Sequence, residues 1–245
     1  MEKYTFVVEK PCPICMKSTR VVKTRSRLVV EKRDEDLCTH YKGFNPYFYK
    51  IWICEHCGFA ADEKTFLTKM PKIYRQKLWE YLSNKQLDIE FTEERNLPDA
   101  VASYQLALKY LEIIDGSLSK RATLNLNLAW LYRAKKEAEK EKEYMTKAAE
   151  LFDESISKER YPVDGLSDTG ALYLVGAIYY RLGDFEKCAQ HLSRIIGDQT
   201  VRSREPKVYD RARDLWGEVR AIQKKQEEEK NKKNAPAKSK GRGFF

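Results

Sequence analysis

The sequence contains two Cys-x-x-Cys pairs, and their thiols are the side chains best suited to do chemistry. The pairs are Cys12-Pro13-Ile14-Cys15 and Cys54-Glu55-His56-Cys57, with 38 residues between them. Two residues between cysteines allow a tight turn to aim both sulfur atoms at one metal ion about 2.3 Å away. Four thiolates complete a tetrahedral site and leave no open position. The sequence therefore predicts one structural zinc ion held by Cys12, Cys15, Cys54 and Cys57.

The residues beside the two pairs favour metal binding over redox chemistry. Gly58 directly follows the second pair, and glycine readily adopts the positive φ angle that such a turn needs. A short segment with a small core also needs a metal ion to stay folded. The competing interpretation is a thiol oxidoreductase, because Cys-Pro-Ile-Cys is similar to a disulfide-exchange motif. That motif requires a helix after it, whereas the β-branched run Val21–Val30 predicts a strand.

A further thiol and imidazole lie between the two pairs, at Cys38 and His40. They could replace one of the four cysteines or hold a second metal ion. The simpler interpretation is a loop cysteine and a surface histidine, and the sequence leaves these alternatives open. Cys188 falls in a helical stripe of apolar residues, which indicates a small core residue.

The elements that must position these ligands are short strands, whereas the rest of the chain is helical. Three β-branched and aromatic runs predict strands: Tyr4–Val8, Val21–Val30 and Tyr47–Ile53. Apolar residues then recur at helical spacing, up to a Lys-rich end that is low in apolar content and predicts disorder. The predicted fold class is α+β, mainly α. It comprises a small zinc-ribbon-like β domain at 1–65, a tetratricopeptide-like α-helical solenoid at 66–228 and a disordered basic tail at 229–245.

The helical part shows the spacing of tetratricopeptide repeats, in which paired helices stack into a solenoid. Leu172, Gly176 and Tyr179 match the first helix of a repeat, and the small residue at 176 would let the paired helices approach closely. Ala148 and Phe152 match the second helix of an earlier copy. Helices are expected at 66–82 with a break at Pro71, 97–114, 119–139, 141–157, 167–182, 184–196 and 206–228.

A solenoid of this kind presents a concave groove, and the expected register places aromatic and arginine side chains in it. Such residues are enriched at binding hot spots, so the groove predicts capture of a protein or peptide partner. The predicted partner-binding residues are Trp130, Arg133, Tyr173, Tyr180 and Arg181. Packing in a core is the commoner role for each of these aromatic residues.

The net charge of +9 makes nucleic acid the main alternative partner. Five of the nine excess positive charges lie between Lys224 and Phe245, where they attract any polyanion without specificity. Lys23, Arg25 and Arg27 alternate along an expected strand and so share one face, which could contact phosphates or simply face solvent. Binding through the basic zinc domain and the tail is therefore the alternative to a protein-binding scaffold.

The sequence shows no arrangement typical of a catalytic site. It has three histidines and lacks a phosphate-binding loop, a nucleophile elbow and an HExxH motif. It also lacks an apolar segment after Met1 and any run of about 20 apolar residues that could span a membrane. We therefore expect a non-enzymatic cytoplasmic protein, in a compartment where thiols stay reduced.

Several motifs occur together in the N-terminal part. They are Cys12-Pro13-Ile14-Cys15, Asp36-Leu37-Cys38 followed by Tyr41, Asn45-Pro46 followed by Tyr49, and Cys57-Gly58-Phe59-Ala60-Ala61 at the second cysteine pair. In this combination, and over most of its length, the chain resembles a bacterial family known as domain of unknown function 2225. The resemblance implies a bacterial cytoplasmic protein that joins a cysteine-rich N-terminus to tetratricopeptide-like helices. It also implies a cysteine at the position of Cys38, and it implies no activity.

Overall fold

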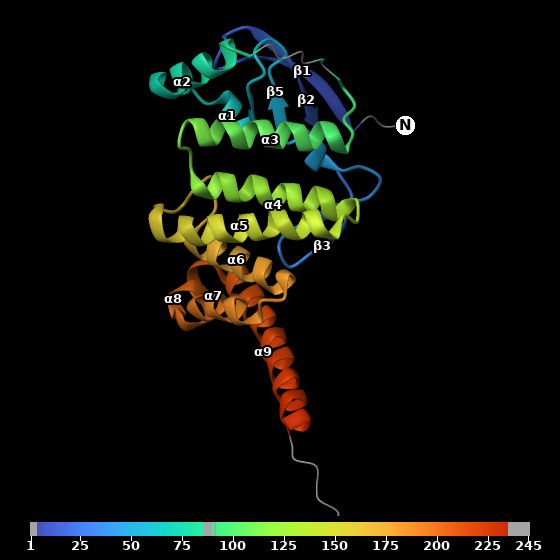
Figure 1. Ribbon diagram of the computed structural model, residues 1–245, viewed down its shortest axis with the longest axis vertical. Helices are drawn as coiled ribbons and strands as arrows, with labels where there is room; N and C mark the ends of the chain where they lie inside the picture. Colours follow the sequence, from blue (N-terminus) through green and yellow to red (C-terminus); the bar gives the residue numbers. More distant parts are fainter. Residues whose placement is uncertain (1–3, 86–89, 91, 235–245) are drawn as a thin grey trace, which may run out of the picture. The chain divides into compact units, whose positions relative to one another are not determined.

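The computed structural model describes residues 4–85, 90 and 92–234 of the chain. Contacts divide the chain into two compact units, Met1–Ala171 and Leu172–Phe245. Strands lie before residue 63 and helices make up most of the later described residues (Figure 1). This arrangement confirms the α+β, mainly α, fold class. The domain boundary expected near residue 65 and the assignment to tetratricopeptide repeats stay predictions.

The strands form three antiparallel pairs, and each pair encloses one group of cysteines. β1 (Thr5–Pro11) pairs with β2 (Ser18–Thr24), β3 (Val30–Arg33) with β4 (Thr39–Tyr41), and β5 (Ile51–Ile53) with β6 (Ala60–Asp62). Cys12 and Cys15 lie between β1 and β2, Cys38 lies between β3 and β4, and Cys54 and Cys57 lie between β5 and β6. Strand pairing therefore fixes where each connection begins and ends.

Two of the expected strands are shorter than predicted. The run Val21–Val30 is split, because the chain leaves β2 after Thr24 and re-enters a strand only at β3. The run Tyr47–Ile53 begins with the 3₁₀ turn η1 (Pro46–Tyr49). Asn45 caps this turn, since its side-chain oxygen accepts a backbone hydrogen bond at 3.0 Å, and proline is favoured at a helix start.

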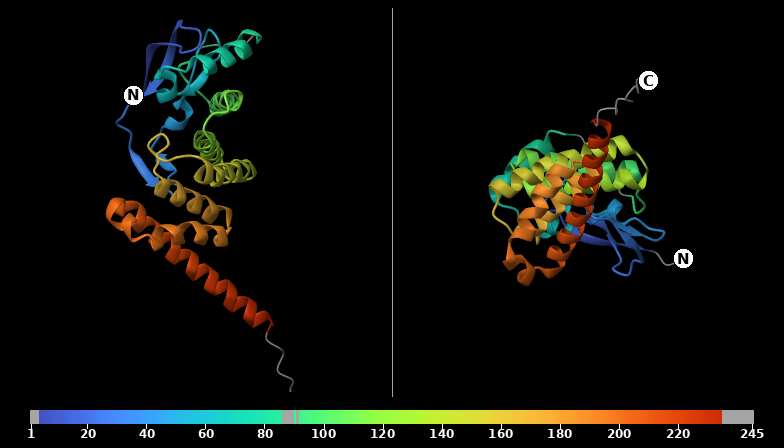
Figure 2. Two further views of the ribbon diagram at one scale, coloured as in Figure 1. Left: turned by 90° about the vertical axis from the view of Figure 1, so that its left-hand side faces the viewer. Right: turned by 90° about the horizontal axis from the view of Figure 1, so that it is seen from below.

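The helices of the first unit follow the strands and form successive layers. Their bounds are α1 (Glu63–Leu67), α2 (Lys72–Ser83), α3 (Leu97–Ile113), α4 (Leu118–Ala134) and α5 (Ala138–Lys158). Pro71 separates α1 from α2, as predicted. Helices α3, α4 and α5 lie side by side in both Figure 1 and Figure 2, with α4 in the middle.

Helix α4 is the centre of the first unit. Its residues 124–132 are all buried, on every side of the helix, because α3, α5 and the turn η1 contact it. A helix that is apolar all round must be enclosed in this way. The carboxylate of Glu159 caps its N-terminus by accepting hydrogen bonds from the backbone N–H groups of Leu118 at 2.7 Å and Ser119 at 3.0 Å.

Two tyrosines of α3 attach the strand region to the helices. The Tyr110 hydroxyl donates to the carbonyl oxygen of Gly58 at 2.8 Å, and the Tyr104 hydroxyl donates to the carbonyl oxygen of Tyr47 at 2.9 Å. Burial raises the pKa of both Tyr104 and Tyr110 above the ordinary value, so both remain protonated donors. The second cysteine pair is thus bonded directly to the helical layers of the same unit.

The second unit begins inside α6 (Asp168–Leu182) and continues with α7 (Phe185–Gly197), α8 (Gln199–Arg204) and α9 (Pro206–Asn234). Gly176 on α6 lies close to α7: a Cβ atom added there would meet Leu192 Cδ2 at 2.9 Å. The small residue therefore allows the close helix approach that the sequence predicts. Cys188 is buried among these helices.

Helix α9 extends into the segment predicted to be a disordered basic tail. Helix α9 continues to Asn234, six residues past the helix end expected at 228. Residues 235–245 of the predicted disordered tail lie outside the described residues.

Candidate metal centre

Both cysteine pairs sit in turns with the same backbone hydrogen bonds. In the first, the Cys12 N–H donates to the Lys17 carbonyl at 2.9 Å and the Met16 N–H donates to the Cys12 carbonyl at 3.0 Å. In the second, the Cys54 N–H donates to the Phe59 carbonyl and the Gly58 N–H donates to the Cys54 carbonyl, both at 2.8 Å. The two turns are therefore equivalent in geometry.

One residue in each turn adopts a left-handed backbone conformation. Gly58 has a φ of 76°, as the sequence predicts, and Met16 has a φ of 64° at the equivalent position. Positive φ is uncommon for a residue with a side chain, so sequence reasoning missed Met16. The Ile14 N–H also donates to the Cys12 sulfur at 3.4 Å, an interaction that favours the thiolate form.

The four sulfur atoms lie close together. Cys12 Sγ lies 3.7 Å from Cys57 Sγ, and Cys15 Sγ lies 3.7 Å from Cys54 Sγ. All four sulfur atoms lie within 4.8 Å of one another. A tetrahedral ion with metal–sulfur bonds of about 2.3 Å places its sulfur atoms about 3.8 Å apart. The four cysteines can therefore coordinate one metal ion with little movement.

The close packing of the four thiols also favours binding of a cation. Cys12 and Cys54 are fully buried. The hydrogen bond from Cys12 holds the pKa of Cys54 well below its usual value, whereas contacts with Cys12 and Cys54 raise the pKa of Cys57. The contact with Cys54 raises the pKa of Cys12 to about 12. Each thiolate disfavours ionisation of its neighbours through charge repulsion. All four thiols can therefore ionise together only around a positive ion.

Polar contacts hold the second turn against β2. The Glu55 N–H donates to Thr19 Oγ1 at 3.1 Å, and the Arg20 guanidinium donates to the Glu55 carboxylate at 2.8 Å. His56 Nε2 lies 2.7 Å from the Ser18 carbonyl oxygen. His56 thus bonds the backbone of β2 rather than joining the four sulfur atoms.

Cys38 and His40 belong to a separate cluster that includes Asp34. The ligand atoms of these three side chains lie within 4.8 Å of one another. His40 Nε2 and Asp34 Oδ2 are 2.7 Å apart. The structure therefore does not bring Cys38 or His40 to the four-cysteine centre. Sequence reasoning missed Asp34, although it is the first residue of the loop that carries Cys38.

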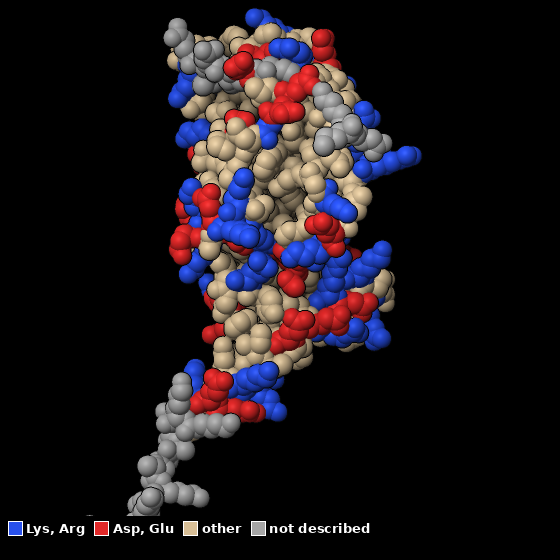
Figure 3. All heavy atoms as spheres, turned by 90° about the vertical axis from the view of Figure 1, so that its right-hand side faces the viewer, with Lys and Arg blue, Asp and Glu red and all other residues tan. Residues whose placement is uncertain are grey.

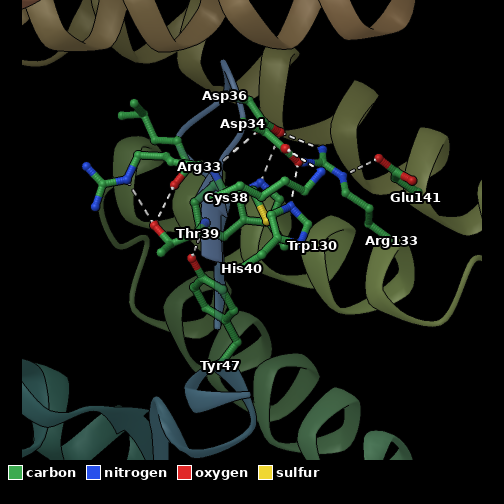
Figure 4. A network of polar contacts seen from close by, with 12 residues as sticks. Arg33, Asp34, Asp36, Cys38, Thr39, His40, Tyr47, Trp130, Arg133 and Glu141 are labelled. Atoms are coloured by element: carbon green, nitrogen blue, oxygen red, sulfur yellow. Dashed lines mark hydrogen bonds and ion pairs between the residues drawn. The ribbon is translucent and has the colours of Figure 1, made fainter. Parts of the chain in front are cut away.

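Two of the predicted groove residues, Trp130 and Arg133, face a buried ion-pair network instead (Figure 4). Trp130 is 9% exposed, and its Nε1 donates to Asp36 Oδ2 at 3.0 Å. Arg133 donates from Nη1 to Asp34 at 2.8 Å, from Nη2 to Asp36 at 2.6 Å and from Nε to Glu141 at 2.7 Å. The loop between β3 and β4 covers both side chains, so the expected groove position for them has to be corrected.

Burial and hydrogen bonds determine the charge state of the side chains in this network. Asp36 is fully buried. Burial of Asp34 acts to raise its pKa, but hydrogen bonds from His40 and Lys32 outweigh that effect and lower the pKa to about 2. The ion pairs with Asp36 and Glu141 raise the pKa of Arg133 despite its burial. The loop is thereby bonded to α4 through charged groups.

The other predicted groove residues lie on α6, in the second unit. Tyr173 is 5% exposed. Tyr180 is half-buried, and its hydroxyl donates to Glu218 Oε2 at 3.1 Å. Arg181 is exposed. Partner binding by Tyr173, Tyr180 and Arg181 stays a prediction, whereas Trp130 and Arg133 face the ion-pair network of the first unit.

A different groove opens within the first unit. It lies along α3, α4 and α5 and has a volume of about 520 Å³. Half-buried apolar side chains from α3 and α5, Leu108, Tyr144 and Leu151, form part of its lining. Its charged lining residues are Lys109, Glu112, Arg121, Lys147, Glu150 and Glu154. Sequence periodicity did not predict this groove, because it depends on how far apart α3 and α5 are held.

Within the described part of the chain, no helix is both long enough and apolar enough to cross a membrane. No curated protein and no solved structure matches the chain. A family model described as an uncharacterized protein conserved in bacteria, DUF2225, matches residues 7–219. This match spans both cysteine pairs, the Asp34–Cys38–His40 cluster, helices α1 to α8 and α9 up to residue 219. The chain therefore belongs to the DUF2225 family of proteins conserved in bacteria.

Proposed function

We propose that this protein is a non-enzymatic scaffold, stabilised by one structural zinc ion, that binds a peptide segment of a partner protein. The observation that carries the proposal is the open groove along α3, α4 and α5, on the same compact unit as the four-cysteine centre. The zinc ion would fix the strand region, and the strand region in turn would fix α3, one wall of the groove.

The donor set supports zinc as the metal. Four sulfur ligands in a tetrahedral arrangement are typical of zinc or iron–sulfur sites. A site with four thiolates has no open position for substrate, so its role would be structural. Each sulfur atom of the first turn lies 3.7 Å from one of the second turn, which supports an ion shared by both turns over a thiol–disulfide pair within Cys12-x-x-Cys15.

The lining of the groove supports a peptide as the ligand. Leu108 and Leu151 offer apolar surface, Tyr144 adds an aromatic ring, and the remaining lining includes charged residues of both signs. Lys147 Nζ lies over the Tyr144 ring at 5.0 Å, and Gln105 Nε2 donates to the Tyr144 hydroxyl at 3.4 Å. Apolar and aromatic surface beside charged groups of both signs is typical of protein-recognition sites.

The surface charge gives less support to nucleic acid as the partner. Lys23 of the predicted basic stripe pairs with Glu63 at 2.7 Å, and Arg20 on the same strand pairs with Glu55 at 2.8 Å. Positive and negative side chains are interspersed on the face shown in Figure 3, rather than gathered into one basic surface. Nucleic-acid binding therefore remains the alternative proposal.

The peptide groove is tested most sharply at Tyr144. Peptides are first selected from a random displayed library on the zinc-loaded, unmodified full chain. We expect these peptides to bind Tyr144→Ala at least about tenfold more weakly than the unmodified chain, which is about 1.4 kcal/mol. The reason is that aromatic anchors dominate such interfaces. Binding is measured by calorimetry.

The control for this test is Tyr74→Ala, which removes a half-buried tyrosine from α2, away from the groove. Peptide affinity should be unchanged in this variant, and circular dichroism checks that both variants fold. Equal affinity for Tyr144→Ala and the unmodified chain, or a library that yields no binders, would count against the groove.

A further inference from the structure

The loop between β3 and β4 gathers three side chains whose chemistry the peptide-binding proposal does not use. They are a carboxylate, a thiol and an imidazole, from Asp34, Cys38 and His40 (Figure 4). Cys38 is 3% exposed, the Asp34 side chain is 10% exposed and the His40 side chain is 26% exposed. The group is thus shielded from solvent on the thiol side and reachable on the imidazole side.

We propose that Asp34, Cys38 and His40 bind a second divalent metal ion of the zinc class. Thiolate, imidazole and carboxylate are the three donor types that zinc takes in proteins. Zinc bonds of about 2.0 to 2.3 Å place neighbouring ligand atoms about 3.3 to 3.8 Å apart. The three ligand atoms here already lie within 4.8 Å of one another. The widest separation has to close by about 1 Å, whereas His40 Nε2 and Asp34 Oδ2, now 2.7 Å apart, have to move apart slightly.

The backbone of the loop holds the ligands in place without a metal. The Asp34 N–H donates to the Cys38 carbonyl at 2.8 Å, and the Leu37 N–H donates to the Asp34 carbonyl at 3.0 Å. Leu37 turns the chain with a φ of 68°. His40 lies on β4, paired with Lys32 of β3. Cys38 directly precedes this strand, and its sulfur atom lies within 4.8 Å of the other two ligand atoms.

Side chains around the cluster form hydrogen bonds that hold its ligands in position. Arg133 Nη1 donates to Asp34 Oδ2 at 2.8 Å, which fixes the carboxylate while leaving it further lone pairs for a metal. Ligating carboxylates are commonly hydrogen-bonded in this way. On the other side of the strand, the Thr39 N–H donates to the Tyr47 hydroxyl at 3.0 Å. This bond anchors the backbone between Cys38 and His40.

The charges in contact with the cluster do not prevent a cation from binding. Lys32 pairs with Asp34 Oδ1 at 3.1 Å, but its side chain is 65% exposed and screened by solvent. Arg133 pairs with three carboxylates, those of Asp34, Asp36 and Glu141. Its one positive charge is thus divided among three negative groups. On ion entry, the hydrogen bond between His40 Nε2 and Asp34 Oδ2 would be replaced by two bonds to the metal.

Three protein ligands leave a fourth position open, unlike the four-cysteine centre. Water is the expected occupant, since His40 is the most exposed of the three ligands. The ion would close the loop that covers Trp130 and Arg133, and so would strengthen the attachment of the loop to α4.

The test is the zinc stoichiometry of the purified full chain, measured by competition titration with zinc alone and by elemental analysis. We expect two zinc ions per chain, falling to one in both Cys38→Ala and His40→Gln, with circular dichroism to check folding. The matched control is Cys188→Ala, which removes a buried thiol from the second unit and should retain two ions.

One zinc ion in the unmodified chain, unchanged by Cys38→Ala or His40→Gln, would overturn the proposal and leave only the ion pair between His40 and Asp34. Failure of the four-cysteine centre would give a different result: the number of zinc ions per chain would then stay the same in Cys15→Ser. Cobalt(II) added to the unmodified chain gives a check independent of any variant. Two spectroscopically different cobalt sites support the proposal, and one site with four sulfur ligands alone contradicts it.

Discussion

Replacing Arg133 with alanine should lower the free energy of unfolding of the first unit by about 3–5 kcal/mol. The guanidinium is 9% exposed and is bonded to Asp34, Asp36 and Glu141. Removal of one partner from a buried ion pair is strongly destabilising, because it leaves an uncompensated buried charge. Here that charge is the carboxylate of Asp36, which is fully buried. Urea unfolding followed by far-UV circular dichroism measures the loss.

Two further variants distinguish a buried ion pair from simple loss of packing. Arg75→Ala removes an exposed arginine from α2 and should change stability by less than about 0.5 kcal/mol. Combining Arg133→Met with Asp36→Leu should recover part of the loss, since apolar residues of similar volume can replace a buried pair. Equal unfolding midpoints for Arg133→Ala and Arg75→Ala would contradict the network.

Replacing Cys15 with serine should unfold the strand region of the first unit. Apparent binding free energies of structural zinc sites are about 10–16 kcal/mol, comparable with the whole stability of a typical domain, about 5–15 kcal/mol. The loss should extend to α3, because Tyr110 of that helix bonds the turn that contains Cys57. We expect the loss of one zinc ion per chain, rapid proteolysis between residues 5 and 62, and a reduced strand signal in circular dichroism.

Chelation of the metal from the unmodified chain should reproduce this unfolding, and return of zinc should reverse it. Cys188→Ala is the control for loss of a buried thiol outside the centre. A Cys15→Ser chain that keeps its full zinc content and its protease resistance would show that the four sulfur atoms do not share an ion.

The elements of this fold follow closely from local sequence signals. Apolar residues recurring at helical spacing predicted the bounds of helices α3 to α7 to within about five residues, with the largest difference at the end of α4. Pro71 and Gly58 acted as predicted through their own backbone preferences. The Cys-x-x-Cys spacing placed two cysteines in each turn because each turn is a local structure. Contacts of Glu55 and His56 with β2 hold the second turn beside the first, so the four sulfur atoms lie together.

The sequence could not predict which side chains face one another across long separations. Trp130 and Arg133 match the spacing of groove residues, yet Asp36, 94 and 97 positions away, bonds both of them. A periodic pattern shows that a side chain lies on a given face, but not which other segment covers that face. Asp34 and the groove along α3 and α5 were missed for the same reason.

The contacts between the loop and α4 also explain why charged residues are buried at this position. The loop between β3 and β4 has few apolar side chains, since Asp34, Glu35 and Asp36 follow one another. It attaches to α4 through Arg133 and Trp130 instead of through a core of its own. A second metal ion at Cys38 and His40 would stabilise the same attachment from within the loop.

The most direct test of the four-cysteine centre is zinc K-edge X-ray absorption on the full-length Cys38→Ala chain loaded with one equivalent of zinc. The structure predicts four sulfur neighbours at about 2.3 Å and no lighter ligand in the first shell. Nitrogen or oxygen neighbours at about 2.0 Å, or a chain that retains no zinc, would contradict the shared ion and, with it, the scaffold that depends on it.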